Sequence, residues 1–135
     1  MRTTVVLGLI MLGAITLSAG DRGSAEEAKA LLQKAAEHYK KVGRKQAMED
    51  FTGKKSPWVD RDLYVACMDS KHVIIANGSF PNVVGMSADL SKDHRGNPLG
   101  TGSWDAAAQG GIQTEEWNWH NPVTGKMEHK IGFLE

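Results

Sequence analysis

The stretch from Trp117 to Lys130 constrains the fold more than any other part of the sequence, because it has the pattern of a β-hairpin. Trp117 and Trp119 stand two residues apart, the spacing that places side chains on one face of a strand. Turn-forming residues 121–125 separate them from a second alternating run over residues 127–134. The return strand is therefore predicted to bring Lys130 alongside the tryptophans. Such a face suits either an apolar core or a pocket for a small acid.

Length and composition exclude several classes of protein. A chain of 135 residues supports one domain. Its 16 basic residues balance 16 acidic ones, which argues against binding nucleic acid or a membrane surface through charge. The single cysteine, Cys67, lies in an apolar run and is interpreted as a buried thiol. The sequence has no serine elbow, no phosphate loop and no recognisable carboxylate pair, so we predict that it is not an enzyme.

The first 25 residues have the layout of a secretory signal peptide. Arg2 precedes an apolar run over residues 5–17, and small residues follow at 18–20 and again at 23–25. The apolar run is shorter than the roughly 20 residues of a membrane span, so cleavage after Gly20 or Ala25 is expected in preference to an uncleaved anchor. Residues 26–135 are then predicted to form a periplasmic or otherwise extracytoplasmic domain.

Apolar residues at helical spacing predict a long amphipathic helix over residues 28–42. Ser24 and Glu27 fit a capping box for this helix, and Gly43 is expected to end it. A short second helix is predicted over residues 47–51. From Leu63 onward the apolar period changes from helical to two, which is typical of strands.

The predicted strands are residues 63–68, 73–76, 113–119 and 127–134. Between the two hairpins, residues 77–111 are rich in Gly, Pro, Asn and Asp and are predicted to form a loop with a short helix around 103–108. A connection this long is typical of a binding loop. The order of elements predicts an α+β domain in which an antiparallel sheet packs against the N-terminal helix.

Two groups of side chains could be read as metal sites, but neither has the spacing of one. They are His120, Glu128 and His129 on the second hairpin, and Asp89, Asp93 and Asn97 in the long loop. We interpret the first group as solvated and the second as a turn. No metal and no other cofactor is predicted.

One set of residues spread along the chain resembles a known family. The set comprises Asp62–Val65, a turn containing Asp69, Gly85, the turn Asp93–Asn97, and the run Trp-x-Trp-x-Asn-Pro-x-Thr-Gly-Lys from Trp117 to Lys126, with Lys130 four residues on. Together these residues resemble the single Cache domain of type 2. The resemblance covers nearly everything after the predicted signal peptide. It implies a PAS-like antiparallel sheet and a domain that senses small molecules, often short organic acids, outside the cell.

The resemblance also implies a ligand site between the sheet and residues 77–111. Aromatic side chains wall this site in the family, and a lysine on the penultimate strand commonly anchors the carboxylate of the ligand. Phe133 stands where the family often has a tyrosine, and Asn77 follows the position where it often has a histidine. The residues assigned to ligand binding are Trp117, Trp119, Lys130, Tyr64, Asn77 and Phe133.

The residues themselves leave alternatives open. The tryptophans could be simple core, because aromatic side chains bury large areas on one strand face. Lys130 could occupy an exposed edge, since a buried ammonium without a partner is costly. Tyr64 and Asn77 could satisfy backbone groups instead of a ligand.

The family's final, central strand has no counterpart before Glu135, so the recognised domain is expected to be truncated. Its neighbours should pair with each other or with another chain, or keep unpaired backbone groups. Our first functional prediction is an exported, non-catalytic sensor of a short organic acid that signals, for example in chemotaxis, through a membrane protein or a homodimer. The alternatives are a strand-accepting interaction module and the N-terminal fragment of a membrane chemoreceptor or histidine kinase.

Overall fold

The computed structural model describes residues 6–12 and 22–135. Most of the predicted signal peptide, including the cleavage position after Gly20, lies outside the described residues. The strands are β1 (Val6–Leu12), β2 (Val59–Asp60), β3 (Leu63–Met68), β4 (Ile74–Asn77), β5 (Gln113–His120) and β6 (Met127–Leu134). The helices are α1 (Ala25–Val42), α2 (Arg44–Phe51), α3 (Leu99–Ala107) and the short 3₁₀ turns η1 (Pro81–Val83) and η2 (Ala88–Leu90).

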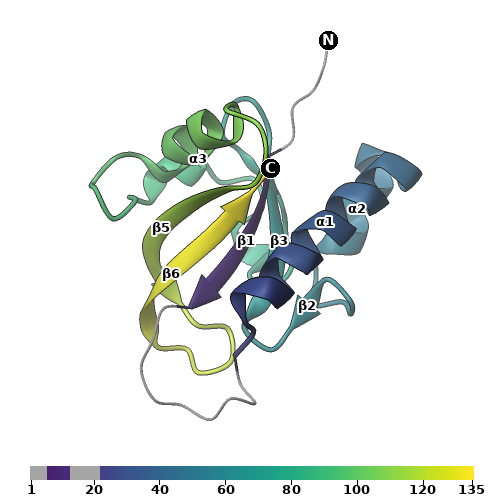
Figure 1. Ribbon diagram of the computed structural model, residues 1–135, viewed down its shortest axis with the longest axis horizontal. Helices are drawn as coiled ribbons and strands as arrows, with labels where there is room; N and C mark the ends of the chain where they lie inside the picture. The colour runs from purple at the N-terminus through teal and green to yellow at the C-terminus, as the bar shows by residue number, and fades with distance from the viewer. Residues whose placement is uncertain (1–5, 13–21) are drawn as a thin grey trace.

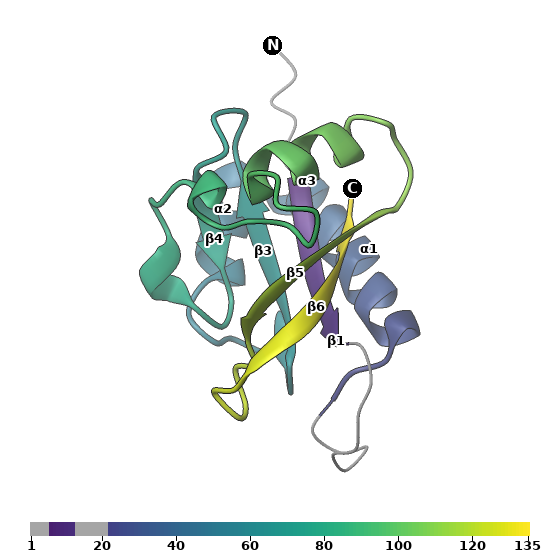
Figure 2. The same ribbon diagram turned by 90° about the vertical axis from the view of Figure 1, so that its left-hand side faces the viewer.

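All of these strands belong to one antiparallel sheet, in the order β2-β3-β1-β6-β5, with β4 also paired to β3. Helices α1 and α2 lie on one face of the sheet, and α3 with the preceding loop lies on the other (Figures 1 and 2). The predicted α+β class is therefore confirmed, as are the two hairpins. Within the described residues, none of the helices combines the length and apolar character that crossing a membrane requires.

Helix α1 begins at the capping box that the sequence predicts. The Ser24 hydroxyl accepts a hydrogen bond from the backbone N–H of Glu27, and the Glu27 carboxylate accepts one from the N–H of Ser24. The helix ends at Gly43, whose φ of 82° is rarely adopted by residues with a side chain. Both ends of the longest helix are thus fixed by local chemistry, which explains why its position could be predicted.

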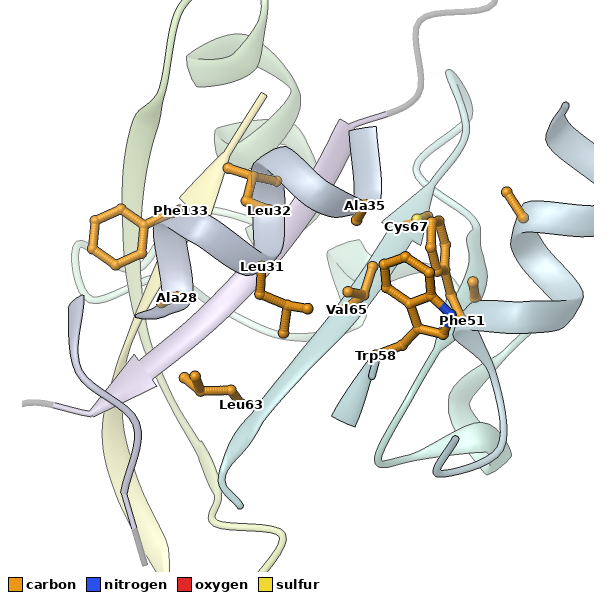
Figure 3. Close-up of a cluster of buried hydrophobic side chains, with 12 residues drawn as sticks. Ala28, Leu31, Leu32, Ala35, Phe51, Trp58, Leu63, Val65, Cys67 and Phe133 are labelled. Carbon is orange, nitrogen blue, oxygen red and sulfur yellow. The ribbon is translucent and has the colours of Figure 1, made fainter. Parts of the chain in front are cut away.

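The main core lies between α1, α2 and the sheet. Leu63, Val65 and Cys67 alternate along β3 toward these helices, where they meet the apolar face of α1 together with Phe51 and Trp58 (Figure 3). Cys67 is a buried free thiol, as predicted, and burial raises its pKa far above the usual range. This thiol is therefore protonated and unreactive at neutral pH.

Strand β1 fills the central position of the sheet. It pairs with β3 from Val6↔Met68 to Leu9↔Val65, and with β6 from Gly8↔Leu134 to Leu12↔Lys130. The expectation that the strands on either side would pair with each other or with another chain is therefore wrong, because seven residues of the N-terminal apolar run lie between them. The structure is that of the uncleaved chain, so cleavage of the signal peptide stays a prediction.

Helix α3 is held over the other face of the sheet by its first turn. The Asp89 carboxylate accepts hydrogen bonds from the backbone N–H and the hydroxyl of Thr101, at 2.7 and 3.1 Å. Gly100 allows the helix to approach closely, because a Cβ there would lie 2.8 Å from the Cβ of His72. The sequence predicted this helix around residues 103–108, and it begins four residues earlier, at Leu99.

Candidate functional site

A cavity of about 120 Å³ lies between the sheet and the segment from η1 to α3. Its floor is formed by residues of β3, β4, β5 and β6, and its cover includes Val83, Ala88, Leu99 and Ser103. The walls are mainly apolar. This is the location that the family resemblance implied, and the long loop predicted to be a binding loop supplies the cover.

Trp117 and Trp119 both line the cavity, as their spacing predicts. Trp119 packs edge-on against Phe80, with 5.9 Å between ring centroids. Phe80 in turn packs edge-on against Tyr64 at 5.5 Å, so that three rings form a row beside the cavity. Phe80 was not predicted, because no periodicity marks a single aromatic residue inside an irregular loop.

Tyr64 and Asn77 bring polar groups to the cavity from neighbouring strands. The Asn77 carboxamide oxygen accepts a hydrogen bond from the Phe80 backbone N–H at 2.8 Å, which leaves its NH₂ group pointing elsewhere as a donor. Neither this NH₂ group nor the Tyr64 hydroxyl donates to any described residue. Burial, and then the nearby Asp62 carboxyl, raise the pKa of Tyr64 far above its usual range, so that the hydroxyl remains a neutral donor.

Lys130 does not line the cavity, although its backbone is directly opposite Trp117. Its side chain is fully buried, and its Nζ lies 3.5 Å from Oε2 of Glu128. The predicted alternative of an exposed edge position is therefore wrong. Burial lowers the pKa of Lys130, while the carboxylates of Glu128 and Asp62 oppose that shift.

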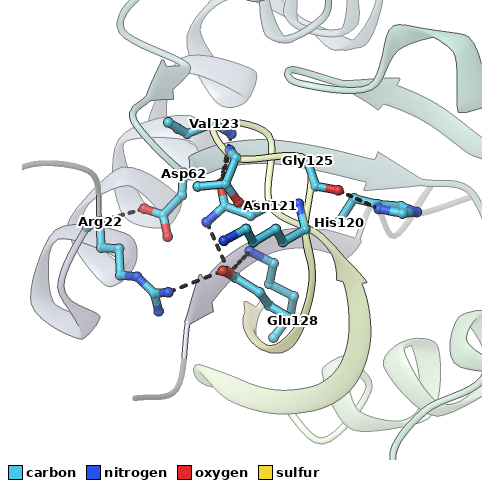
Figure 4. A network of polar contacts seen from close by, with 11 residues as sticks. Arg22, Asp62, His120, Asn121, Val123, Gly125 and Glu128 are labelled. Carbon is cyan, nitrogen blue, oxygen red and sulfur yellow. Dashed lines mark hydrogen bonds and ion pairs between the residues drawn. The ribbon is translucent and has the colours of Figure 1, made fainter. Parts of the chain in front are cut away.

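Lys130 is part of a polar cluster made of Arg22, Asp62, Asn121, Glu128 and Lys130. Arg22 Nη2 is 3.2 Å from Glu128 Oε1, and Asn121 donates to Glu128 Oε2 at 3.0 Å (Figure 4). The backbone N–H of Gly23 donates to Asp62 at 2.6 Å. Burial raises the pKa of Asp62, and the Gly23 hydrogen bond and Lys130 counteract this. Two cations face two carboxylates, so the cluster is electrically balanced.

Phe133 lies on the opposite side of the sheet from the cavity, where it packs against the buried face of α1 (Figure 3). The next residue, Leu134, lines the cavity instead, because side chains alternate along a strand. Four of the six predicted ligand-binding residues are thus brought together, while Lys130 and Phe133 lie outside the cavity lining.

The described ranges, 6–12 and 22–135, contain no group of three or more His, Cys, Asp or Glu side chains that could share a metal ion. The two histidines of the second hairpin have protein partners. His120 Nδ1 lies 3.0 Å from the carbonyl oxygen of Gly125, and His129 Nε2 lies 2.9 Å from Glu116 Oε2. Asp93 and Asn97 form a turn, in which the backbone N–H of Asn97 donates to Asp93.

Comparison with known families gives one match. The sequence model of a family described as single Cache domain 2 matches residues 16–135. This range contains every residue that lines the cavity and excludes β1. No curated protein and no solved structure matches the chain.

Proposed function

Because the chain belongs to the single Cache domain 2 family, whose members are extracytoplasmic sensor domains, we propose that it senses a short organic acid through the cavity under α3. It binds this ligand without chemical conversion and passes the signal through a membrane protein or a second copy of itself. The observation that carries the proposal is the mainly apolar cavity, whose lining includes Tyr64 and Asn77, two residues with side-chain donors that no other described residue accepts from.

The size of the cavity limits the ligand. An engineered apolar cavity of about 150 Å³ accommodates benzene, which has six non-hydrogen atoms, so a cavity of about 120 Å³ corresponds to a ligand of roughly five. A straight-chain acid of about three to four carbons has this size. Its hydrocarbon tail would contact Trp117 and Trp119, and its carboxylate would accept hydrogen bonds from Tyr64 and Asn77.

Lys130 does not contact the ligand in this proposal. Its ammonium is already 3.5 Å from Glu128, so a ligand carboxylate would have to compete with that partner for direct contact. We therefore propose Tyr64 and Asn77 as the first contacts of the ligand carboxylate, while Lys130 remains paired with Glu128 in the polar cluster. Phe133 is not included, because its ring packs on the α1 side of the sheet.

Thermal unfolding with a panel of straight-chain acids tests the proposal. A ligand that binds only the folded state stabilises it by about 2.7 kcal/mol at a concentration one hundred times its Kd. Acids of about three to four carbons should raise the Tm more than their primary amides, which have the same shape without the charge. Equal shifts for acid and amide would contradict an acid ligand, and no shift from any acid at millimolar concentration would contradict the proposed site.

A second candidate function, a strand-accepting interaction module, is supported by the position of β1. This strand pairs on both sides and lies outside the family match. Removal of residues 1–20 by processing would leave β3 and β6 with unpaired backbone groups facing each other, a site that a strand from a partner or a second copy could fill. The mass of the processed chain in solution tests this: a well-folded, strictly monomeric product would contradict it.

A further inference from the structure

A pair of buried carboxyl groups lies beside the cavity and plays no part in the proposed ligand contacts. Asp93 belongs to the loop before α3 and Glu115 to β5, and their exposed fractions are 5% and 4%. Glu115 Oε1 finds no hydrogen-bond donor among the described residues. A buried carboxylate without a donor is strongly unfavourable, so protonation of one of the two carboxyl groups lowers the free energy of the folded state.

Helix α3 closes directly over the pair. A Cβ at Gly102 would lie 3.2 Å from Glu115 Oε1 and 3.3 Å from Asp93 Oδ2. On the sheet side, the cross-strand neighbour of Glu115 is Gly132. A glycine of the helix thus covers both carboxyl groups and a glycine of the sheet stands beside Glu115, and neither adds a charge.

Asp93 is the member of the pair that stays ionised. Its carboxylate accepts hydrogen bonds from the backbone N–H groups of Arg95 and Asn97, at 2.9 and 2.8 Å. Burial raises the pKa of Asp93, but these donors outweigh it and the net shift is downward. Burial, and then the hydrogen bond and charge of Asp93, raise the pKa of Glu115 to about 7. Glu115 therefore holds the proton and donates it toward Asp93.

Three other charged or titratable side chains lie near the pair: Arg95, His94 and, on β6 two residues from the cross-strand neighbour Gly132, Lys130, which is paired with Glu128. Arg95 Nε lies 3.9 Å from Asp93 Oδ2, and Arg95 and His94 offset part of the negative charge on Glu115. The neighbours of Glu115 on the same face of β5 are Gln113 and Trp117, and neither of them is charged.

The loop that carries Asp93 and the helix α3 also border the cavity. The backbone of Asp93 forms a β-bridge with Trp117, and the N–H of His94 donates to the carbonyl of Glu116 at 2.8 Å. Ser91, Leu99 and Ser103, from the loop and α3, are part of the cavity lining. Any force between the carboxyl groups therefore acts on the cover of the cavity.

We propose that Asp93 and Glu115 form a pH-sensitive latch. With one proton shared, the pair holds the loop 91–98 and α3 against β5. When the proton is lost, the two carboxylates repel each other and the cover loosens. The effect of the latch on ligand affinity rests on the proposed function, whereas its effect on the stability of the fold does not.

The pH dependence of Tm for the full chain tests the latch. A carboxyl whose pKa is raised in the folded state stabilises the fold below its unfolded pKa of 4.5, and this contribution is lost as pH rises toward 7. We expect the wild-type Tm to fall by about 5 °C or more between pH 5 and pH 8, relative to Glu115→Gln. The glutamine remains neutral and can still donate to Asp93. The control is Asp105→Asn, which removes an exposed acid of helix α3 and should retain the wild-type slope.

A Glu115→Gln variant with the same pH slope as the wild type would overturn the proposal. Infrared absorption of the wild type gives a second reading that needs no variant. A buried protonated carboxyl band should be present at pH 6 and absent at pH 8.5, and a spectrum without that change contradicts the latch. If the Tm depends on pH as expected but the protein binds no acid at any pH, the latch remains supported and only the ligand proposal is refuted.

Discussion

Trp117 and Lys130 are direct cross-strand partners on β5 and β6, but only the tryptophan borders the cavity. The indole forms part of the wall, while the ammonium is neutralised by Glu128 at 3.5 Å. A strand pair that could be read as either core or pocket therefore serves both purposes. The tryptophan shapes the proposed ligand site, and the lysine completes a balanced polar cluster within the fold.

Replacing Lys130 by methionine should destabilise the fold severely. The substitution leaves Asp62 and Glu128 facing Arg22 alone, and removing one partner of a buried ion pair typically costs about 3–5 kcal/mol. Urea unfolding measures the loss. The double variant Lys130→Met/Glu128→Gln restores the balance of one cation to one carboxylate and should recover part of the stability. A single variant as stable as the wild type would mean that the cluster is not maintained in solution.

Filling the cavity should abolish ligand binding without unfolding the protein. Ser103→Leu adds an apolar side chain from the cover into the cavity, with a typical overpacking penalty of about 1–3 kcal/mol. We expect the variant to lose the Tm shift produced by short acids. Gln109→Leu, a control at an exposed position just beyond α3, should keep it. An unchanged shift in Ser103→Leu would place the acid elsewhere.

The structure predicts that cleavage at the two candidate processing positions gives products of different stability. A chain that begins at Glu26 lacks Arg22, Gly23 and Ser24, and so loses the ion pair to Glu128, the hydrogen bond to Asp62 and the N-cap of α1. The lost cap and buried hydrogen bond together correspond to about 2–4 kcal/mol. A chain that begins at Asp21 keeps all three contacts and should unfold at the higher denaturant concentration. Equal midpoints would show that these contacts contribute nothing.

Proline in β1 should destabilise the full chain. Leu9 pairs with Val65 on one side and Phe133 on the other, so its N–H faces a paired neighbour in either direction. Leu9→Pro removes that donor, and we expect a loss of about 1–3 kcal/mol. Leu9→Val keeps the donor and should remain close to the wild type. Equal stability of the two variants would show that the segment does not form part of the sheet.

Local patterns predicted the elements whose boundaries local chemistry determines. Ser24, Glu27 and Gly43 marked the ends of α1, and period two placed Trp117 and Trp119 together on one face. The early start of α3 could not be predicted, because Gly100 and Gly102 lower its helical propensity and the contact of Asp89 with Thr101 is tertiary.

The buried polar groups, namely the cluster around Lys130 and the pair Asp93 and Glu115, were harder to predict. The partners of Lys130 include Asp62, which is distant in sequence, so no local pattern revealed the cluster. Glu115 did carry a signal, since it shares the period-two face of Trp117 and an acidic residue on an inward face requires a partner. Its partner, Asp93, was interpreted only as part of a turn. β1 was missed because the same apolar run fits both a signal peptide and a buried strand.

The central place of β1 has a consequence for how the protein is made. Residues 6–12 are synthesised long before residues 127–134, with which they pair. Contacts between such distant parts of a chain form late and slowly during folding. The sheet can close only after residues 127–134 have been translated, and until then the apolar segment is available for other interactions. The strand that completes the sheet is thus exposed to the surroundings of the nascent chain throughout this interval.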